Sequence, residues 1–157
     1  DLHYPLRRQR QMCIRDRSLK GNEVILEIGT GSGYQTSILS LLSRRVYSIE
    51  RIKALLVNAQ SCFKKLKLTN IISEFGDGFL GWPKLAPFDH MIITCAVKKI
   101  DNRLLNQIRV NGSCVVPIGK TKSQQRLKKI TIGNDRNGDF WEDLGKVSFV
   151  PLITEKD

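Results

Sequence analysis

The chain has 157 residues, 41% of them hydrophobic, which suits one folded domain and argues against a disordered chain. Its net charge of +11 would attract nucleic acid or any acidic substrate, and charge alone does not choose between these partners. No stretch approaches the roughly 20 apolar residues of a membrane span, so we expect no membrane association. Four scattered cysteines without a CxxC pair, and only two histidines, predict no metal site and a cytoplasmic location.

The first 20 residues differ in composition and periodicity from the rest of the chain. They hold six basic residues against two acidic ones and follow neither the helical nor the strand period. We expect an atypical basic segment over residues 1–20, and a non-native origin for residues 1 to about 17 is our hypothesis. A single domain over residues 21–157 is expected to follow.

From residue 23 onward, apolar strand-like runs alternate with segments of helical period. The expected strands are 23–29, 44–50, 70–75, 89–97, 113–119, 125–133 and 141–152, and the expected helices are 34–42, 52–66 and 102–110. The last two strands flank a turn at 134–139 and predict an antiparallel hairpin. The sequence therefore predicts an α/β fold, a doubly wound and mostly parallel sheet with an antiparallel C-terminal hairpin.

Three glycines follow the first predicted strand at alternate positions, Gly29, Gly31 and Gly33. A turn of this kind lets a ligand approach the main chain without meeting a Cβ atom. The spacing is G-x-G-x-G, and Tyr34 stands where a dinucleotide fingerprint would require its third glycine. This spacing disfavours a nicotinamide or flavin cofactor.

Two acidic residues accompany the glycine-rich turn. Glu50 ends the second predicted strand, where a carboxylate can accept hydrogen bonds from both hydroxyl groups of an adenosine ribose. Glu27 interrupts the first apolar strand, and burying its charge without a partner would be costly. A ligand ammonium group would supply that partner, whereas a pyrophosphate would be repelled.

The tripeptide GDG at 76–78 ends the third predicted strand beside the same crevice. Asp77 can accept a hydrogen bond from an adenine amino group, while Gly78 permits close approach of the main chain. Together with Glu27 and Glu50, this describes a site for a nucleoside that carries an amino group and no phosphate. S-adenosyl-L-methionine fits that description.

The segments LEIGTGSGYQTSIL (26–39), GDGFLGWPKLAPFD (76–89) and VSFVPL (147–152) resemble the protein-L-isoaspartate O-methyltransferase family. The resemblance runs from about Val24 to Leu152. It implies a Rossmann-like methyltransferase fold, S-adenosyl-L-methionine as methyl donor without a metal, and methyl transfer to the free carboxylate of L-isoaspartyl residues in damaged proteins. The Ser-Gln-Pro segment that the family places ahead of the glycine loop is missing from residues 1–20.

Carried over position by position, the resemblance implies a set of donor-binding residues in and beside the predicted loops. These are Glu27, Gly29, Thr30, Gly31, Ser32, Gly33, Gln35, Glu50, Asp77, Gly78 and Thr94. Thr94 would lie near the reacting centre, and Gln35 would either orient the donor or cap the helix that follows the loop. No residue is assigned a catalytic role, because the acceptor carboxylate is already ionised and the donor already activated.

The expected partners are proteins or peptides that contain L-isoaspartyl residues, with no nucleic acid and with a monomeric state favoured. Three other readings stay open. They are a fragment that binds the donor but transfers nothing, an RNA or small-molecule methyltransferase, and, with the least support, a nicotinamide dehydrogenase.

Overall fold

The computed structural model describes residues 19–134 and 138–152. The hypothesis on the origin of residues 1 to about 17 lies outside them and stays a prediction, as does the centre of the turn expected at 134–139.

A seven-stranded sheet forms the centre of the described chain, with the strand order β3-β2-β1-β4-β5-β6-β7. The strands are β1 (Val24–Ile28), β2 (Arg45–Glu50), β3 (Ile71–Phe75), β4 (Phe88–Ile93), β5 (Ile108–Ile118), β6 (Arg126–Thr131) and β7 (Phe140–Lys146). The first five strands pair in parallel, whereas β5 with β6 and β6 with β7 pair antiparallel. The predicted fold class and terminal hairpin are confirmed.

Alternate residues of the central strands pack into two cores, one on each face of the sheet. On β1, Ile25 joins one core while Leu26 and Ile28 join the other. All three are nearly inaccessible to solvent, which is why the sequence of a central parallel strand reads as a continuous apolar run. Glu27 shares its face with Ile25 because side chains alternate along a strand.

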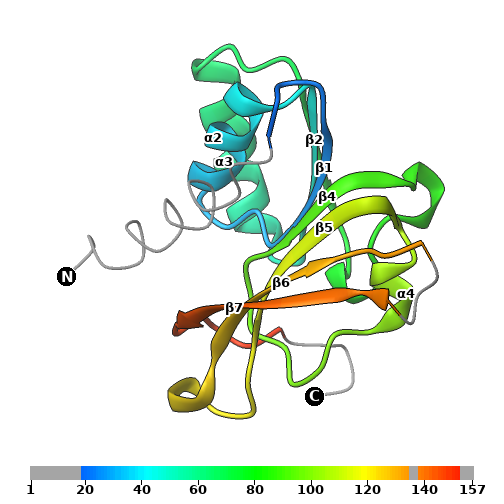
Figure 1. The fold of residues 1–157 in the computed structure, drawn as a ribbon. Helices are drawn as coiled ribbons and strands as arrows, with labels where there is room; N and C mark the ends of the chain where they lie inside the picture. The colour runs from blue at the N-terminus through cyan, green and yellow to red at the C-terminus, as the bar shows by residue number, and fades with distance from the viewer. Residues whose placement is uncertain (1–18, 135–137, 153–157) are drawn as a thin grey trace.

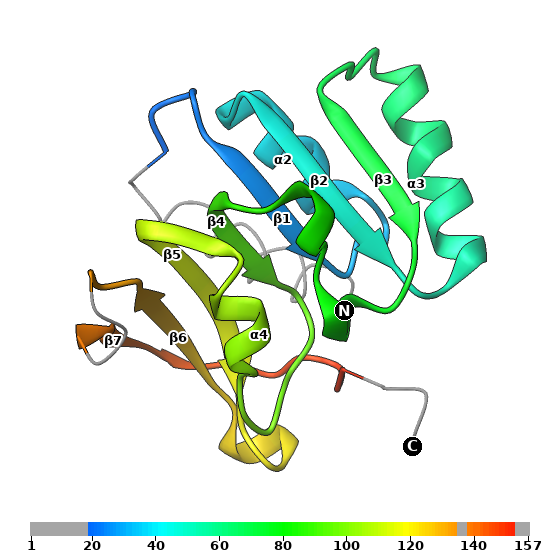
Figure 2. The same ribbon diagram turned by 90° about the vertical axis from the view of Figure 1, so that its right-hand side faces the viewer.

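The helices are divided between the two faces. They are α2 (Tyr34–Leu42), α3 (Lys53–Lys65) and α4 (Asn102–Leu105), with short 3₁₀ helices at Gly78–Leu80, Pro83–Leu85 and Lys122–Gln124. Figure 1 shows α2 and α3 together beside β1 and β2, and the turned view in Figure 2 shows α4 in front of the sheet and α2 behind it. No helix in the described ranges is long and apolar enough to cross a membrane.

The prediction of a helix over residues 102–110 is wrong in its second half. The helix α4 ends at Leu105, and Ile108 already pairs with Phe88 as the first residue of β5. The pairing register then shifts before His90, and Asn111 adopts a φ of 64°. The Asn-Gly pair at 111–112 therefore marks an irregularity inside a long strand rather than the end of a helix.

The last expected strand is also shorter than predicted, since β7 ends at Lys146 and residues 147–152 leave the sheet. This C-terminal return is held by the buried amide of Gln125, which donates to the carbonyl oxygen of Phe149 at 3.1 Å. Its Oε1 also accepts from the backbone N–H of Phe149 at 2.5 Å. Further on, the backbone of Ala96 exchanges two hydrogen bonds with Val150 and Leu152.

We predict that Gln125→Met destabilises the chain by about 1–3 kcal/mol, because a thioether of similar size leaves both peptide groups of Phe149 without their partner. Denaturant unfolding gives the free energy, and hydrogen exchange at the Phe149 amide gives the local effect. A variant with unchanged stability and unchanged Phe149 protection would show that this clamp does not hold the C-terminal return.

Candidate functional site

A cavity of about 540 Å³ opens at the carboxyl ends of β1, β2 and β4. We call it the strand-end cavity. Ligands of open α/β sheets bind at this edge, where crossover connections diverge to opposite faces, and the volume suits a small organic ligand. Its lining residues are Ile28, Gly29, Gly31, Ile49, Glu50, Arg51, Ile52, Leu55, Gly78, Thr94, Cys95, Val150, Pro151 and Leu152.

The glycine loop between β1 and α2 presents bare main chain to this cavity. Gly31 has a φ of 55°, and a Cβ atom added there would meet no heavy atom within 4 Å. The space beside it therefore belongs to the cavity. Gly29 has a φ of 96° and is constrained sterically, because an added Cβ would collide with the hydroxyl oxygen of Thr94.

Glu50 links the glycine loop to the start of α3. Its Oε2 accepts a hydrogen bond from the backbone N–H of Gly31 at 2.8 Å, and its Oε1 accepts from the N–H of Ile52 at 2.9 Å. The side chain is only 6% exposed, yet it lines the cavity. Each carboxylate oxygen keeps a lone pair for another donor, so Glu50 can accept two hydroxyl groups from a ligand diol.

Thr94 closes the opposite side of the glycine loop, directly after β4. Its backbone N–H donates to the carbonyl oxygen of Ile28 at 2.9 Å. Its hydroxyl lies 2.9 Å from that oxygen and 2.7 Å from the carbonyl oxygen of Gly29. The hydroxyl proton is thereby directed into the loop, and the Thr94 hydroxyl oxygen keeps acceptor capacity at the cavity wall.

Glu27 is fully buried under the glycine loop and does not line the cavity. Its Oε2 accepts hydrogen bonds from the hydroxyl groups of Thr36 on α2, at 2.5 Å, and Ser48 on β2, at 2.6 Å. Since the Ser48 proton points to Glu27, the 2.6 Å contact between Ser48 and Thr30 is donated by Thr30. Glu27 therefore joins the loop, α2 and β2 from below.

This geometry differs from the partner that the sequence suggested for Glu27. The hydroxyl groups of Thr36 and Ser48 take the place of the expected ligand ammonium group, while Oε1 has no hydrogen-bond partner among the described residues. Burial is the dominant influence on the acid and raises the pKa of Glu27 to about 7. The two hydroxyl hydrogen bonds oppose this rise, and the nearby charge of Glu50 adds to it.

Gln35 is buried just inside α2, with 2% of its surface exposed. Neither atom of its amide group has a hydrogen-bond partner in the described part of the chain. Helix capping, one of the two roles left open by the sequence, is therefore not what this side chain does. An orienting role toward a ligand stays a prediction, because Gln35 is not among the residues that line the cavity.

The remaining predicted residues surround the cavity without lining it. Gly33 precedes α2 at its N-cap position, and Ser32 is exposed with its hydroxyl 3.4 Å from the backbone nitrogen of Tyr34. Asp77 caps the 3₁₀ helix at Gly78–Leu80 by accepting from the N–H of Phe79 at 2.9 Å. Of the predicted set, the cavity brings together Gly29, Gly31, Glu50, Gly78 and Thr94.

Two groups of residues that line the strand-end cavity were not predicted from the sequence. Arg51 and Ile52 directly follow Glu50, so their place could have been found from the end of β2. Val150, Pro151 and Leu152 arrive through the C-terminal return, which is fixed by hydrogen bonds to Ala96 more than 50 positions earlier and leaves no local signal.

Cys95 is the one thiol that lines the strand-end cavity in the described ranges. Burial, together with the charge of Glu50, raises its pKa to about 12. The thiol therefore stays protonated at neutral pH and is no nucleophile. In the same ranges, no three His, Cys, Asp or Glu side chains are grouped so as to hold a metal ion.

The sequence model of a family described as protein-L-isoaspartate(D-aspartate) O-methyltransferase matches residues 10–157. The chain belongs to this family. The expected resemblance is thus confirmed over most of the sequence.

Two bacterial relatives, both named protein-L-isoaspartate O-methyltransferase, illustrate the similarity. The protein from Caulobacter sp. (strain K31) is 46% identical over 129 residues, which is 82% of this chain and 58% of the relative. The protein from Dictyoglomus turgidum is 48% identical over 138 residues, which is 87% of this chain and 61% of the relative. The chain thus spans about three fifths of the length of these relatives.

Solved structures support the fold. A protein-L-isoaspartate O-methyltransferase superposes with a TM-score of 0.82 at 22% identity, covering 91% of this chain and 46% of that one. A second structure is described as a putative member from Plasmodium falciparum in complex with S-adenosyl-L-homocysteine. It superposes with a TM-score of 0.76 at 23% identity, covering 92% of this chain and 71% of that one. These likenesses establish the Rossmann-like methyltransferase fold.

We predict that Glu27 lowers stability as pH rises from about 4.5 to about 7. The folded chain holds this proton more tightly than the unfolded chain, whose pKa is near 4.5, so stability is lost on ionisation. Glu27→Gln keeps an oxygen acceptor for Thr36 and Ser48 without the charge. Relative to the parent, the variant should gain on the order of 3 kcal/mol between those pH values.

Urea unfolding of the parent and Glu27→Gln at a series of pH values measures this difference. Glu23→Gln serves as a control of opposite sign, because burial raises the pKa of Glu23 but backbone N–H hydrogen bonds outweigh it and leave that pKa lowered. Parallel curves for the parent and Glu27→Gln across this pH range would contradict the prediction.

Proposed function

We propose that this chain transfers a methyl group from S-adenosyl-L-methionine to the free carboxylate of L-isoaspartyl residues in damaged proteins, an activity of protein repair. Family membership gives the reaction class, and names of relatives give the acceptor. The observation that carries the proposal is Glu50. It is a nearly buried carboxylate that lines the cavity and is fixed by two backbone N–H groups beside a glycine loop.

The residues present fit the donor. Glu50 would hold the two ribose hydroxyl groups, and Gly29 and Gly31 would let the methionine portion lie against the main chain. Asp77 and Gly78 would flank the adenine. The apolar walls at Ile49, Ile52 and Leu55 suit a base.

Four predicted residues of the glycine loop region act on the ligand indirectly in this proposal. Glu27 and Thr30 hold the loop through the hydroxyl network, while Ser32 and Gly33 shape its exit into α2. Gln35 is proposed to orient the donor, because its buried amide has no partner among the described residues.

The donor, when bound, supplies an activated methyl group on a sulfonium. The protein then has to hold the acceptor oxygen in line with that methyl carbon and keep water away. The C-terminal return at 150–152 and Thr94 form the cavity walls that would do this. No general base is required, since the acceptor is a carboxylate that is ionised at neutral pH, and Cys95 keeps its proton.

The proposed partners are proteins and peptides with L-isoaspartyl residues, without nucleic acid and with the chain acting as a monomer. A cytoplasmic location is part of the proposal. Cys62, Cys95 and Cys114 are free thiols, the state that a reducing compartment maintains.

The paired-peptide assay tests the proposed reaction. The chain is incubated with methyl-labelled donor and either an L-isoaspartyl peptide or the aspartyl peptide of identical sequence. We expect base-labile methyl ester on the isoaspartyl peptide alone, because its linkage through the β-carboxyl leaves the α-carboxylate free, whereas the aspartyl peptide presents the β-carboxylate one methylene further from the main chain.

Three outcomes would contradict the proposal. Ester on both peptides would remove the isoaspartyl specificity. Methyl transfer to RNA instead would indicate that the chain is an RNA methyltransferase. Calorimetric binding of S-adenosyl-L-homocysteine without transfer to any acceptor would indicate a donor-binding chain that is not an enzyme by itself.

A further inference from the structure

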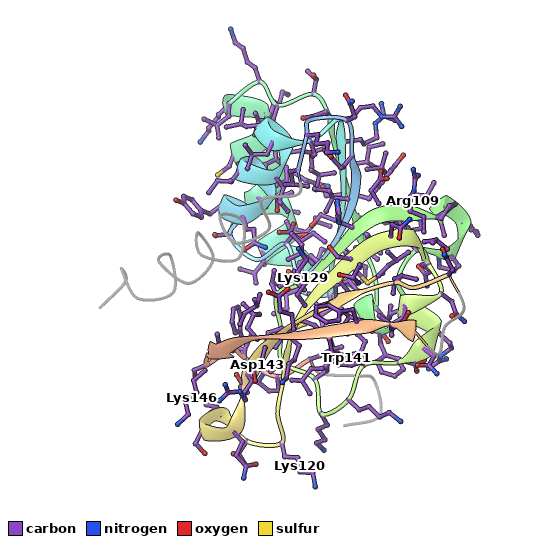
Figure 3. All side chains as sticks on the ribbon, in the orientation of Figure 1. Arg109, Lys120, Lys129, Trp141, Asp143 and Lys146 are labelled. Atoms are coloured by element: carbon purple, nitrogen blue, oxygen red, sulfur yellow. The ribbon has the colours of Figure 1, made fainter. Side chains whose placement is uncertain are left out.

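A second cavity, of about 580 Å³, adjoins the first and is strongly basic. Lys98 and Lys99 reach it from the loop after β4, and Lys120 and Lys122 reach it from the loop after β5. We call it the lysine cavity. All four lysines are exposed, and Figure 3 shows Lys120 at the edge of the molecule, on the loop beyond the sheet.

The two loops that carry the lysines are joined to each other. The backbone N–H of Val97 donates to the carbonyl oxygen of Pro117 at 2.9 Å, and the N–H of Gly119 donates to that of Val97 at 3.0 Å. These bonds extend the parallel pairing of β4 with β5 by one bridge. The main chain next to Lys98 and Lys120 is therefore held by hydrogen bonds.

The charge of this cavity is not balanced within its walls. No Asp or Glu stands among the described residues that line it. The nearby acid Asp101 binds the guanidinium of Arg103 at 2.7 Å and interacts with the charge of Lys99 at longer range. None of the four lysines takes part in an ion pair that the structure places within 4 Å in the described ranges. Four cations around one hollow attract an anionic ligand.

The lysine cavity shares part of its lining with the strand-end cavity. Pro151 and Leu152 line both. Gly78 and Cys95 line the strand-end cavity, and the residues that directly follow them, Phe79 and Ala96, line the lysine cavity. A chain molecule whose reacting group enters the first cavity would lay its neighbouring groups in the second.

We propose that the lysine cavity binds acidic side chains that flank the methylated residue in the acceptor peptide, so that the chain prefers isoaspartyl sites within acidic sequence. This inference rests on the proposed function for its acceptor. Apolar groups of Val97, Pro151 and Leu152 between the lysines suit the stems of peptide side chains.

The same cavity is less suited to a nucleic acid strand. Single strands are bound through bases stacked on aromatic rings, and Phe79 is the one aromatic residue among the described lining residues. The guanidinium of Arg103 already lies over its ring, 5.1 Å from the centroid. The cations of this cavity are grouped in one hollow rather than along a track.

The test uses three L-isoaspartyl peptides that differ only at the two flanking positions, which are Glu, Gln or Lys. Fluorescence anisotropy in the presence of S-adenosyl-L-homocysteine gives Kd, and the methylation assay gives KM and kcat. We expect the Glu peptide to bind about threefold to tenfold more tightly than the Gln peptide, as one or two exposed ion pairs would give. The Lys peptide should bind most weakly. The preference should shrink as salt screens the charges.

The double variant Lys98→Glu/Lys120→Glu should reverse the order of the Glu and Lys peptides while leaving Kd for S-adenosyl-L-homocysteine unchanged. Lys64→Glu/Lys65→Glu, on the exposed end of α3, is the matched control with the same change in net charge. Thermal melting verifies that both variants are folded. The control should keep the order of the parent.

Each contrary result has a distinct meaning. Equal affinity for the three peptides, or an equal effect of the two double variants, would overturn the lysine cavity as an acidic-peptide site. Single-stranded RNA that displaces the Glu peptide at lower concentration than unlabelled peptide would do so as well. Charge-dependent peptide binding without any methyl transfer would instead refute the proposed function alone.

Discussion

The strand-end cavity depends on one carboxylate held by main-chain N–H groups. Glu50 accepts from Gly31 on one side and from Ile52 on the other, so the loop after β1 and the start of α3 are fixed by the same side chain. Charged acceptors make stronger hydrogen bonds than neutral ones, especially away from water. The orientation of both carboxylate oxygens is thus set before any ligand arrives, which reduces the entropy lost on binding.

Two further sets of contacts keep this arrangement rigid. Below the loop, the hydroxyl groups of Thr36 and Ser48 converge on Glu27, a carboxyl group that is fully buried and whose pKa is raised by that burial. Beside the loop, Thr94 fills the space that a side chain at position 29 would need. Polar groups thus position the glycine loop, and apart from Glu50 and Thr94 the ligand-facing surface is largely main chain and apolar side chains.

The sequence was sufficient to predict the parallel sheet, the glycine loop and the acidic residue at the end of β2, because each has a local pattern. It misplaced residues 106–110, where a helical spacing of apolar residues yielded to the pairing of Ile108 with Phe88 on β4. It could not assign Glu27 to hydroxyl partners, since Thr36 and Ser48 meet it only through the packing of α2 and β2. The wall at 150–152 was likewise beyond reach, because its position depends on contacts with Gln125 and Ala96.

We propose that Glu50 recognises a ribose diol, and calorimetry on the folded chain measures this recognition. The ligands are S-adenosyl-L-homocysteine and an analogue that lacks both ribose hydroxyl groups. We expect S-adenosyl-L-homocysteine to bind about 10-fold to 100-fold more tightly than the analogue, the effect of hydrogen bonds to a charged acceptor, and we expect Glu50→Ala to abolish this difference. Equal affinities for the two compounds, or no heat with either, would contradict it.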